Sequence, residues 1–209
     1  MNLIKENYFK TPVYYLNDTS WIENLNINCD KHILDALKNN KDCFKSVYHS
    51  SSLAEDDNFK EFIKFICNIS YKILDEQGYN MNLYSLIISD LWVQEFSKKG
   101  GGNHNSHIHS NSHISGFYFL KCSSKTSFPI FHDSRLNKKM IQLKEKDEKL
   151  NTDSSEKINV TSAPGLFVFF NSYLEHEFIV DNGIEPFRFI HFNLQAIQKE
   201  LVNNNIKRI

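Results

Sequence analysis

The sequence predicts a mainly β fold, a two-sheet antiparallel jelly roll with α-helices packed on it. Between residues 85 and 195, about eight short apolar runs alternate with turn residues such as Gly, Asn and Pro. Helical periodicity is concentrated in the part of the chain before residue 80. Because strands and helices do not alternate along the chain, the pattern argues against a doubly wound parallel sheet and favours two antiparallel sheets.

Length and composition indicate a single domain over residues 1–209. A chain of 209 residues with 41% hydrophobic content is long enough for one sizeable core. The 24 basic and 25 acidic side chains nearly cancel, so charge predicts neither a nucleic-acid nor a membrane partner. No run approaches the roughly 18 apolar residues of a membrane helix, and we expect a cytoplasmic protein. The four irregularly spaced cysteines indicate reduced thiols rather than disulfides.

Residues 1–80 predict one strand followed by two helices. The segment PVYYL reads as a strand ending in a polar turn, where Thr19 or Ser20 could cap the next element. A short amphipathic helix is predicted from about residue 30 to 39. A longer one begins after the acidic residues 55–57 and runs to Gly78. Its apolar stripe predicts core packing and comprises Phe59, Phe62, Ile63, Ile66, Ile69 and Ile73.

The second part of the chain, about residues 85–195, predicts the jelly-roll core. The charged, aperiodic residues 136–157 predict a surface insertion, which could cover a site as a lid. Residues 195–206 are predicted to close the chain as a short helix. The expected strands are 85–96, 105–110, 114–122, 128–132, 158–161, 166–170, 175–180 and 187–194.

Histidines indicate a metal site. His107 and His109 stand two apart, a spacing that places both imidazoles on one face of an extended strand. His176 lies near the start of a later predicted strand, and a jelly roll can bring such a distant residue to the same place. These three nitrogens would leave about three positions of an octahedron open. Open positions are typical of a catalytic metal rather than a structural one.

Arg188 is the candidate partner for a carboxylate. It lies twelve residues after His176 within FRFIHFN, where flanking aromatic residues make a charge unusual. A guanidinium can hold a carboxylate through two parallel hydrogen bonds, and so could orient a dicarboxylate that also chelates the metal. The structural alternative is an ordinary ion pair with Asp181 or Glu185.

Several segments together resemble the iron(II)- and 2-oxoglutarate-dependent oxygenases found in marine bacteria and their phages. These segments are FKTPVYYLN, LWVQEF, the His-x-His before SGFYFL, HDSRL, PGLFVFFNSYLEHEF and RFIHFN. The resemblance implies a double-stranded β-helix, ferrous iron, and 2-oxoglutarate whose decarboxylation to succinate drives hydroxylation of a C–H bond. It implies that His107, His109 and His176 bind iron, and that Arg188 binds 2-oxoglutarate. Tyr118 could offer its hydroxyl to the same cosubstrate, or belong to the barrel core.

The candidate ligands depart from the pattern of the wider superfamily, which presents Asp or Glu at the position of His109. A neutral imidazole there leaves the site one charge unit more positive. Asp133 could supply the missing carboxylate, and His104 could replace His107. Three further histidines, His113, His132 and His191, are expected to be structural or to support the ligands.

Two alternatives to the 2-oxoglutarate-dependent dioxygenase stay open at this point. One is a cupin-like metalloenzyme with three histidine ligands and no need for 2-oxoglutarate. The other is an inactive jelly-roll binding module with a vestigial metal pocket. The substrate, a small molecule or a side chain, is not specified by any motif, and a homodimer is one assembly state left open.

Overall fold

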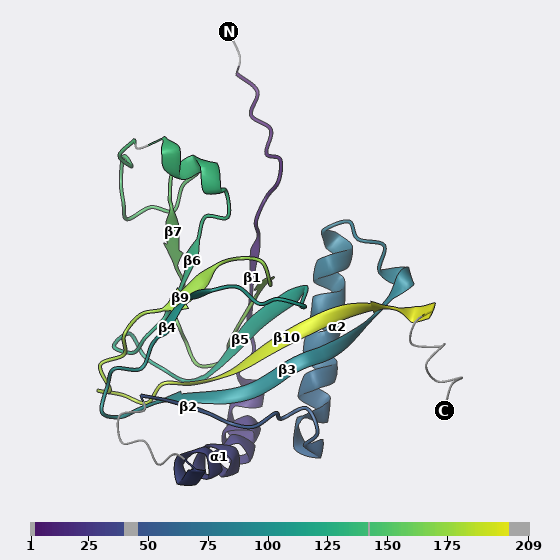
Figure 1. The fold of residues 1–209 in the computed structure, drawn as a ribbon, viewed down its shortest axis with the longest axis vertical. Helices are drawn as coiled ribbons and strands as arrows, with labels where there is room; N and C mark the ends of the chain where they lie inside the picture. Colours follow the sequence, from purple (N-terminus) through teal and green to yellow (C-terminus); the bar gives the residue numbers. More distant parts are fainter. Residues whose placement is uncertain (1–2, 40–45, 142, 201–209) are drawn as a thin grey trace.

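The computed structural model describes residues 3–39, 46–141 and 143–200 (Figure 1). Two α-helices, α1 (Ile22–Asn39) and α2 (Lys60–Glu76), precede most of the strands. The strands are β1 (Val13–Asn17), β2 (Val47–His49), β3 (Tyr84–Phe96), β4 (His104–His107), β5 (Ile114–Lys121), β6 (Pro129–His132), β7 (Lys157–Asn159), β8 (Leu166–Asn171), β9 (His176–Phe178) and β10 (Arg188–Gln198).

The strands form two antiparallel sheets, as predicted. The larger has the order β1-β8-β5-β10-β3-β2 and the smaller has the order β4-β9-β6-β7. Strand β10 lies between β3 and β5, and its pairing with β3 continues to Gln198 opposite Tyr84. The prediction of a helix from 195 is therefore wrong at 195–198, because these residues extend the sheet. Its residues 201–206 lie outside the described part of the chain.

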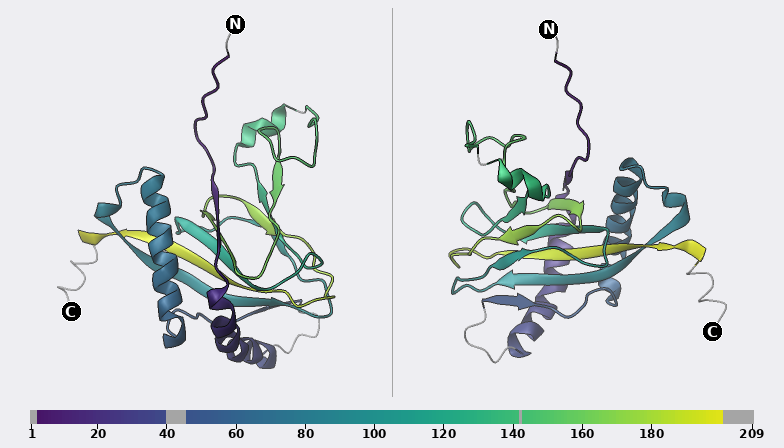
Figure 2. Two further views of the ribbon diagram at one scale, coloured as in Figure 1. Left: turned by 180° about the vertical axis from the view of Figure 1, so that it is seen from behind. Right: turned by 45° about the horizontal axis from the view of Figure 1, so that its top comes forward.

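Both helices cover the outer face of the larger sheet (Figure 2). Helix α1 begins at Ile22, earlier than the predicted start near residue 30. It follows a 3₁₀ turn (Thr19–Trp21) in which the side chain of Asp18 accepts the backbone N–H of Ser20. On α2, Phe62 packs against Tyr118 of β5 and Phe167 of β8. The predicted apolar stripe of α2 thus contacts the sheet. No helix among the described residues has the length and apolarity needed to cross a bilayer.

The larger sheet separates two cores. Toward the helices, β10 presents Ile190, Phe192 and Leu194. Toward the smaller sheet it presents Phe189, which packs with phenylalanines from several strands, including Phe117 and Phe178. Successive side chains of a strand point to opposite faces. Alternation along β10 therefore decides whether a side chain contacts the helices or lies between the two sheets.

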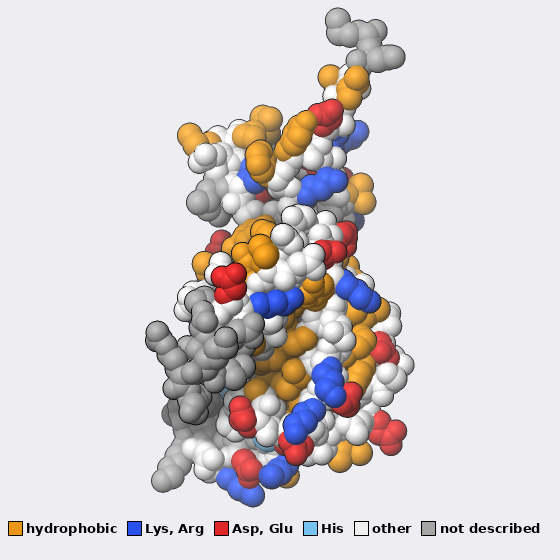
Figure 3. All heavy atoms as spheres, turned by 90° about the vertical axis from the view of Figure 1, so that its right-hand side faces the viewer, with side chains coloured by type: hydrophobic (Ala, Val, Ile, Leu, Met, Phe, Trp, Pro, Cys, Tyr) orange, Lys and Arg blue, Asp and Glu red, His pale blue; other side chains and the backbone are white. Residues whose placement is uncertain are grey.

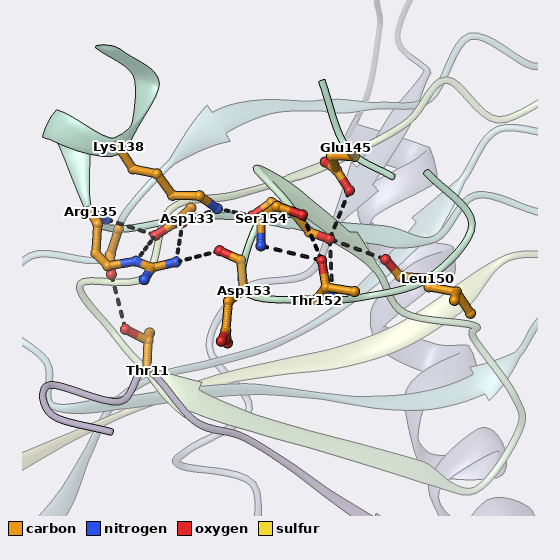
Figure 4. A network of polar contacts seen from close by, with 11 residues as sticks. Thr11, Asp133, Arg135, Lys138, Glu145, Leu150, Thr152, Asp153 and Ser154 are labelled. Carbon is orange, nitrogen blue, oxygen red and sulfur yellow. Dashed lines mark hydrogen bonds and ion pairs between the residues drawn. The ribbon is translucent and has the colours of Figure 1, made fainter. Parts of the chain in front are cut away.

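The insertion between β6 and β7 projects away from the sheets beside the N-terminal segment (Figure 1). Figure 4 shows its polar contacts: Asp133 accepts hydrogen bonds from Arg135 Nε at 3.0 Å and from Lys138 Nζ at 2.9 Å. Thr11 and Ser134 share a 3.0 Å hydrogen bond between their hydroxyls. Thr11, Asp133, Ser134 and Arg135 line an open groove of about 420 Å³ between the insertion and the N-terminal segment.

Charged side chains of both signs are mixed on the side of the molecule shown in Figure 3. Lysine and arginine side chains there lie close to aspartate and glutamate side chains, and apolar side chains are exposed between them. A mixed surface of this kind matches the net charge of −1. This face therefore carries no large field of one sign that would attract a polyanion.

Candidate metal centre

Three histidines converge between the two sheets. His107 is the last residue of β4 and pairs in register with His176, the first residue of β9. His109 follows β4, and its backbone N–H donates to the carbonyl of Ser172 at 3.0 Å. One ring nitrogen from each of the three lies within 4.8 Å of the others. The structure thus brings together the three residues predicted to bind a metal.

The route by which His109 reaches this cluster differs from the prediction. Strand β4 covers His104–His107 rather than 105–110, and its pairing with β9 shifts register between His104 and His107. His107 and His109 therefore do not share one face of a regular strand. The backbone leaves the strand after His107, and the hydrogen bond to Ser172 turns His109 back toward His176.

Hydrogen bonds orient two of the rings for metal binding. The Nδ1–H of His107 donates to the carbonyl of Asn105 at 2.7 Å. The Nδ1–H of His176 donates to the carbonyl of Leu174 at 3.0 Å. Each bond leaves Nε2 with a free lone pair, which is the arrangement usual for metal-binding histidines. The Nε2 of His109 lies 3.3 Å from the Nε2 of His176.

Burial keeps His109 and His176 neutral at pH 7. It lowers the pKa of His109 to about 4, and nearby His107 adds to the effect. It lowers the pKa of His176, which is fully buried, to about 3. Because a histidine must be neutral to bind a metal, neither residue has to lose a proton at pH 7 first. Three imidazoles that converge beside a cavity can serve as ligands of iron(II).

Neither alternative ligand is part of the cluster. Asp133 lies in the groove beside the insertion, where Arg135 and Lys138 hold its carboxylate and its pKa is far below the usual value. His104 lies near the cluster, but its Nε2 is 2.5 Å from the amide nitrogen of Gln94. The prediction that Asp133 could serve as the carboxylate ligand is therefore wrong.

The two side chains predicted to bind 2-oxoglutarate lie on the other face of the larger sheet. Arg188 is 4% exposed and forms hydrogen bonds with Glu95 at 2.6 Å and Asp30 of α1 at 2.6 Å. Tyr118 packs against Phe62 of α2, and its hydroxyl donates to the carbonyl of Asp18. Successive side chains alternate between the two faces of a strand. Arg188 of β10 and Tyr118 of β5 occupy positions that point toward the helices and away from the histidines. The structure thus places neither side chain beside the histidines, and their binding of 2-oxoglutarate stays a prediction. The alternative ion pair of Arg188 exists, but with partners other than Asp181 or Glu185.

The other histidines outside the cluster make structural contacts. His132 lies 3.2 Å from Glu177, and the Nδ1 of His113 accepts the backbone N–H of Ala196. His191 is different, because its Nε2 lies 3.0 Å from the Nε2 of His109. The sequence predicted that His191 is structural or supports the ligands, and it assigned the contact with 2-oxoglutarate to Arg188. The signal for this in the sequence is the alternation of side chains along a strand. His191 points to the same face as Phe189, whereas Arg188 points to the opposite face.

The cavity beside the histidines is small and has no ionic partner for a carboxylate. Its volume is about 20 Å³, enough for one water-sized ligand. None of the described residues lining it is Lys, Arg, Asp or Glu: they are Trp92, Gln94, His104, His107, His109, Phe117, His176, Phe178, Phe189 and His191. The residues present therefore fit iron, but a five-carbon dicarboxylate does not fit unless side chains move. No described residue of the insertion lines this cavity.

Comparisons with known proteins agree with this architecture. Residues 90–193 match the family model described as "Putative 2OG-Fe(II) oxygenase". The sequence matches no curated protein. Among solved structures, a 2OG-Fe(II) oxygenase family oxidoreductase from Burkholderia pseudomallei is 8% identical, with 88% of this chain and 84% of that chain covered and a TM-score of 0.56.

Two further solved structures illustrate the range of similar proteins. A prolyl-4-hydroxylase from Pseudomonas putida is 11% identical, with 88% of this chain and 93% of that chain covered and a TM-score of 0.55. The non-heme alpha-ketoglutarate-dependent epimerase SnoN is 10% identical, with 88% and 76% covered and a TM-score of 0.59. At these identities the likeness establishes the jelly-roll fold and no particular reaction.

The family model and the site are consistent with each other. The matched region runs from β3 to β10 and contains His107, His109 and His176. The family description names iron(II) as the metal and 2-oxoglutarate (2OG) as the cosubstrate. Through residues 90–193, the chain belongs to the 2OG-Fe(II) oxygenase family.

Proposed function

We propose that this protein is an iron(II)- and 2-oxoglutarate-dependent dioxygenase of the hydroxylase type, with a small molecule or a side chain as substrate. The observation that carries the proposal is the convergence of His107, His109 and His176 between the sheets. Its cosubstrate is the one shared by the family to which residues 90–193 belong.

In this function the three histidines hold the iron. The carbonyls of Asn105 and Leu174 keep the Nε2 atoms of His107 and His176 directed at it. The rings of Phe117, Phe131 and Phe170 surround His176 and exclude water from that side. Iron bound there would supply the redox chemistry that couples decarboxylation of 2-oxoglutarate to oxidation of a C–H bond. We assign no residue to the distal carboxylate of 2-oxoglutarate.

A three-histidine metalloenzyme that does not use 2-oxoglutarate is the second candidate. The observation that favours it is the cavity of about 20 Å³ without a charged lining residue among those described. A dicarboxylate bound in an apolar space without a cation would have two uncompensated charges. This candidate shares the metal ligands with the first and differs in the cosubstrate.

An anaerobic titration of the purified protein with Fe(II) and then 2-oxoglutarate tests the proposal. We expect a weak visible charge-transfer band in the wild type, and succinate formation once oxygen is admitted. His176→Ala should abolish both signals. The matched control is His113→Ala, which changes an exposed histidine outside the cluster and should leave both signals unchanged.

The alternatives predict different results. Fe(II) binding that depends on His176, without a band or succinate on addition of 2-oxoglutarate, would support the second candidate. A wild type that binds no divalent metal would contradict both enzyme functions and leave the inactive binding module.

A further inference from the structure

His191 is held rigidly next to the candidate metal ligands. This residue is 4% exposed, and its ring stacks on Trp92 with 4.3 Å between centroids and 2° between planes. The edge of Phe117 contacts it from another side, with 5.3 Å between centroids. A side chain enclosed by two aromatic rings has little freedom to rotate. The nitrogens of His191 therefore keep fixed directions.

The two nitrogens of His191 have different surroundings. Its Nε2 lies 3.0 Å from the Nε2 of His109. Its Nδ1 is buried and has no hydrogen-bond partner among the described residues. A histidine that ligates a metal normally donates its other N–H to a carbonyl or a carboxylate, as His107 and His176 do here. His191 has no such partner, so it does not resemble a fourth ligand.

The proton of His191 is therefore best placed on Nε2. A proton on Nδ1 would be a buried donor without an acceptor, which costs about 1–3 kcal/mol. On Nε2 it can be donated toward His109. When the Nε2 lone pair of His109 binds a metal, this N–H loses its acceptor. It then faces the space beside the metal, where an incoming ligand would bind.

We propose that His191 is a positioning residue that donates a hydrogen bond from Nε2 to a small anionic ligand bound next to His109 on the metal. Trp92 fixes the direction of this hydrogen bond by stacking on the ring. The cavity of about 20 Å³ holds one water-sized group, which is the size of the single atom through which a small anion would bind the metal. The inference depends on the metal-binding part of the proposed function and does not depend on 2-oxoglutarate.

The test uses the full-length protein loaded with Co(II), with azide as the probe ligand, and follows the visible d–d spectrum. His191→Phe keeps a ring against Trp92 but removes the N–H, so azide should bind about 10-fold more weakly. His191→Gln keeps an N–H donor and should recover most of that loss. Co(II) affinity should stay within about threefold of wild type in both variants, because no ligand is removed. His113→Gln, at an exposed histidine, is the matched control.

Three results would overturn the proposal. Unchanged azide affinity in His191→Phe, with a folded protein by circular dichroism, would leave His191 a purely structural residue. A loss of Co(II) affinity of about 100-fold in both variants would make it a fourth ligand instead. A wild type that does not bind Co(II) would refute the metal site itself. By contrast, azide results as expected without an Fe(II)–2-oxoglutarate band would refute only the cosubstrate.

Discussion

At the scale of single residues, His109 is the feature that most distinguishes this site. The wider superfamily has a carboxylate at this position, and here the ring nitrogen of His109 lies 3.3 Å from that of His176. A third imidazole in place of a carboxylate leaves the metal one charge unit more positive. It should therefore favour softer or borderline ions relative to a site with a carboxylate.

Replacing His109 by aspartate tests the importance of this ligand. His109→Asp should keep metal binding, because a carboxylate is also a ligand for iron(II). His109→Ala should weaken it about 100-fold or more, since it removes one of three protein ligands. Anaerobic competition titration with a metal-binding dye measures both affinities. Wild-type affinity in His109→Ala would mean that His107 and His176 bind without it.

At the scale of secondary-structure elements, Arg188 ties helix α1 to the larger sheet. Its guanidinium bonds to Glu95 of β3 and to Asp30 of α1, and this contact holds the pKa of Asp30 below its usual value. The Asp30 side chain is 56% exposed, whereas that of Glu95 is 16% exposed. The pair with Glu95 should therefore contribute most of the stabilisation, because solvent screens it less.

We expect Arg188→Met to lower the free energy of unfolding by about 3 kcal/mol, because it leaves Glu95 partly buried without its partner. Co(II) affinity should not change, since Arg188 lies on the other face of the sheet. Urea unfolding measures the stability. The matched control is Lys125→Met, which breaks a surface pair with Glu185 and should cost less than about 1 kcal/mol. Unchanged stability combined with lost 2-oxoglutarate binding would instead support the sequence-based role of Arg188.

At the scale of the whole molecule, the buried histidines couple stability to pH. Burial lowers the pKa of His104 and His109 to about 4 and that of His176 to about 3, from 6.5. The unfolded chain therefore binds more protons than the folded one between these values and 6.5. The histidine contribution to stability is complete above pH 6.5 and is lost as the pH falls toward 4 and 3.

The metal-free protein should thus unfold at progressively lower urea concentration as the pH decreases from 7 to 4.5. Histidines should account for most of the change in the upper part of this window, because carboxylates titrate mainly near pH 4. Urea titrations in the presence of a chelator measure the effect, and His176→Phe should show a smaller pH dependence than wild type. A urea midpoint independent of pH over this range would contradict the burial of neutral histidines.

Local patterns in the sequence were sufficient for most of the elements, though not for the short strand β2, and for part of the site. The apolar stripe of α2 and the runs that form β3 to β10 follow from helical and strand periodicity. His107, His109 and His176 could be selected because neutral imidazoles at these spacings suit a metal. Element ends were less accurate, as at α1 and β10, because tertiary pairing rather than propensity decides where they stop.

What the sequence determined by itself is the class of fold and the three candidate ligands, since both depend on residue type and periodicity. Only the tertiary structure decided which other side chains lie next to these three candidate ligands. Arg188 and His191 lie three residues apart on β10, and their opposite parity sends one to the helices and the other to the histidines. A one-residue difference along a strand reverses the face, and only the paired sheets establish which face is inside.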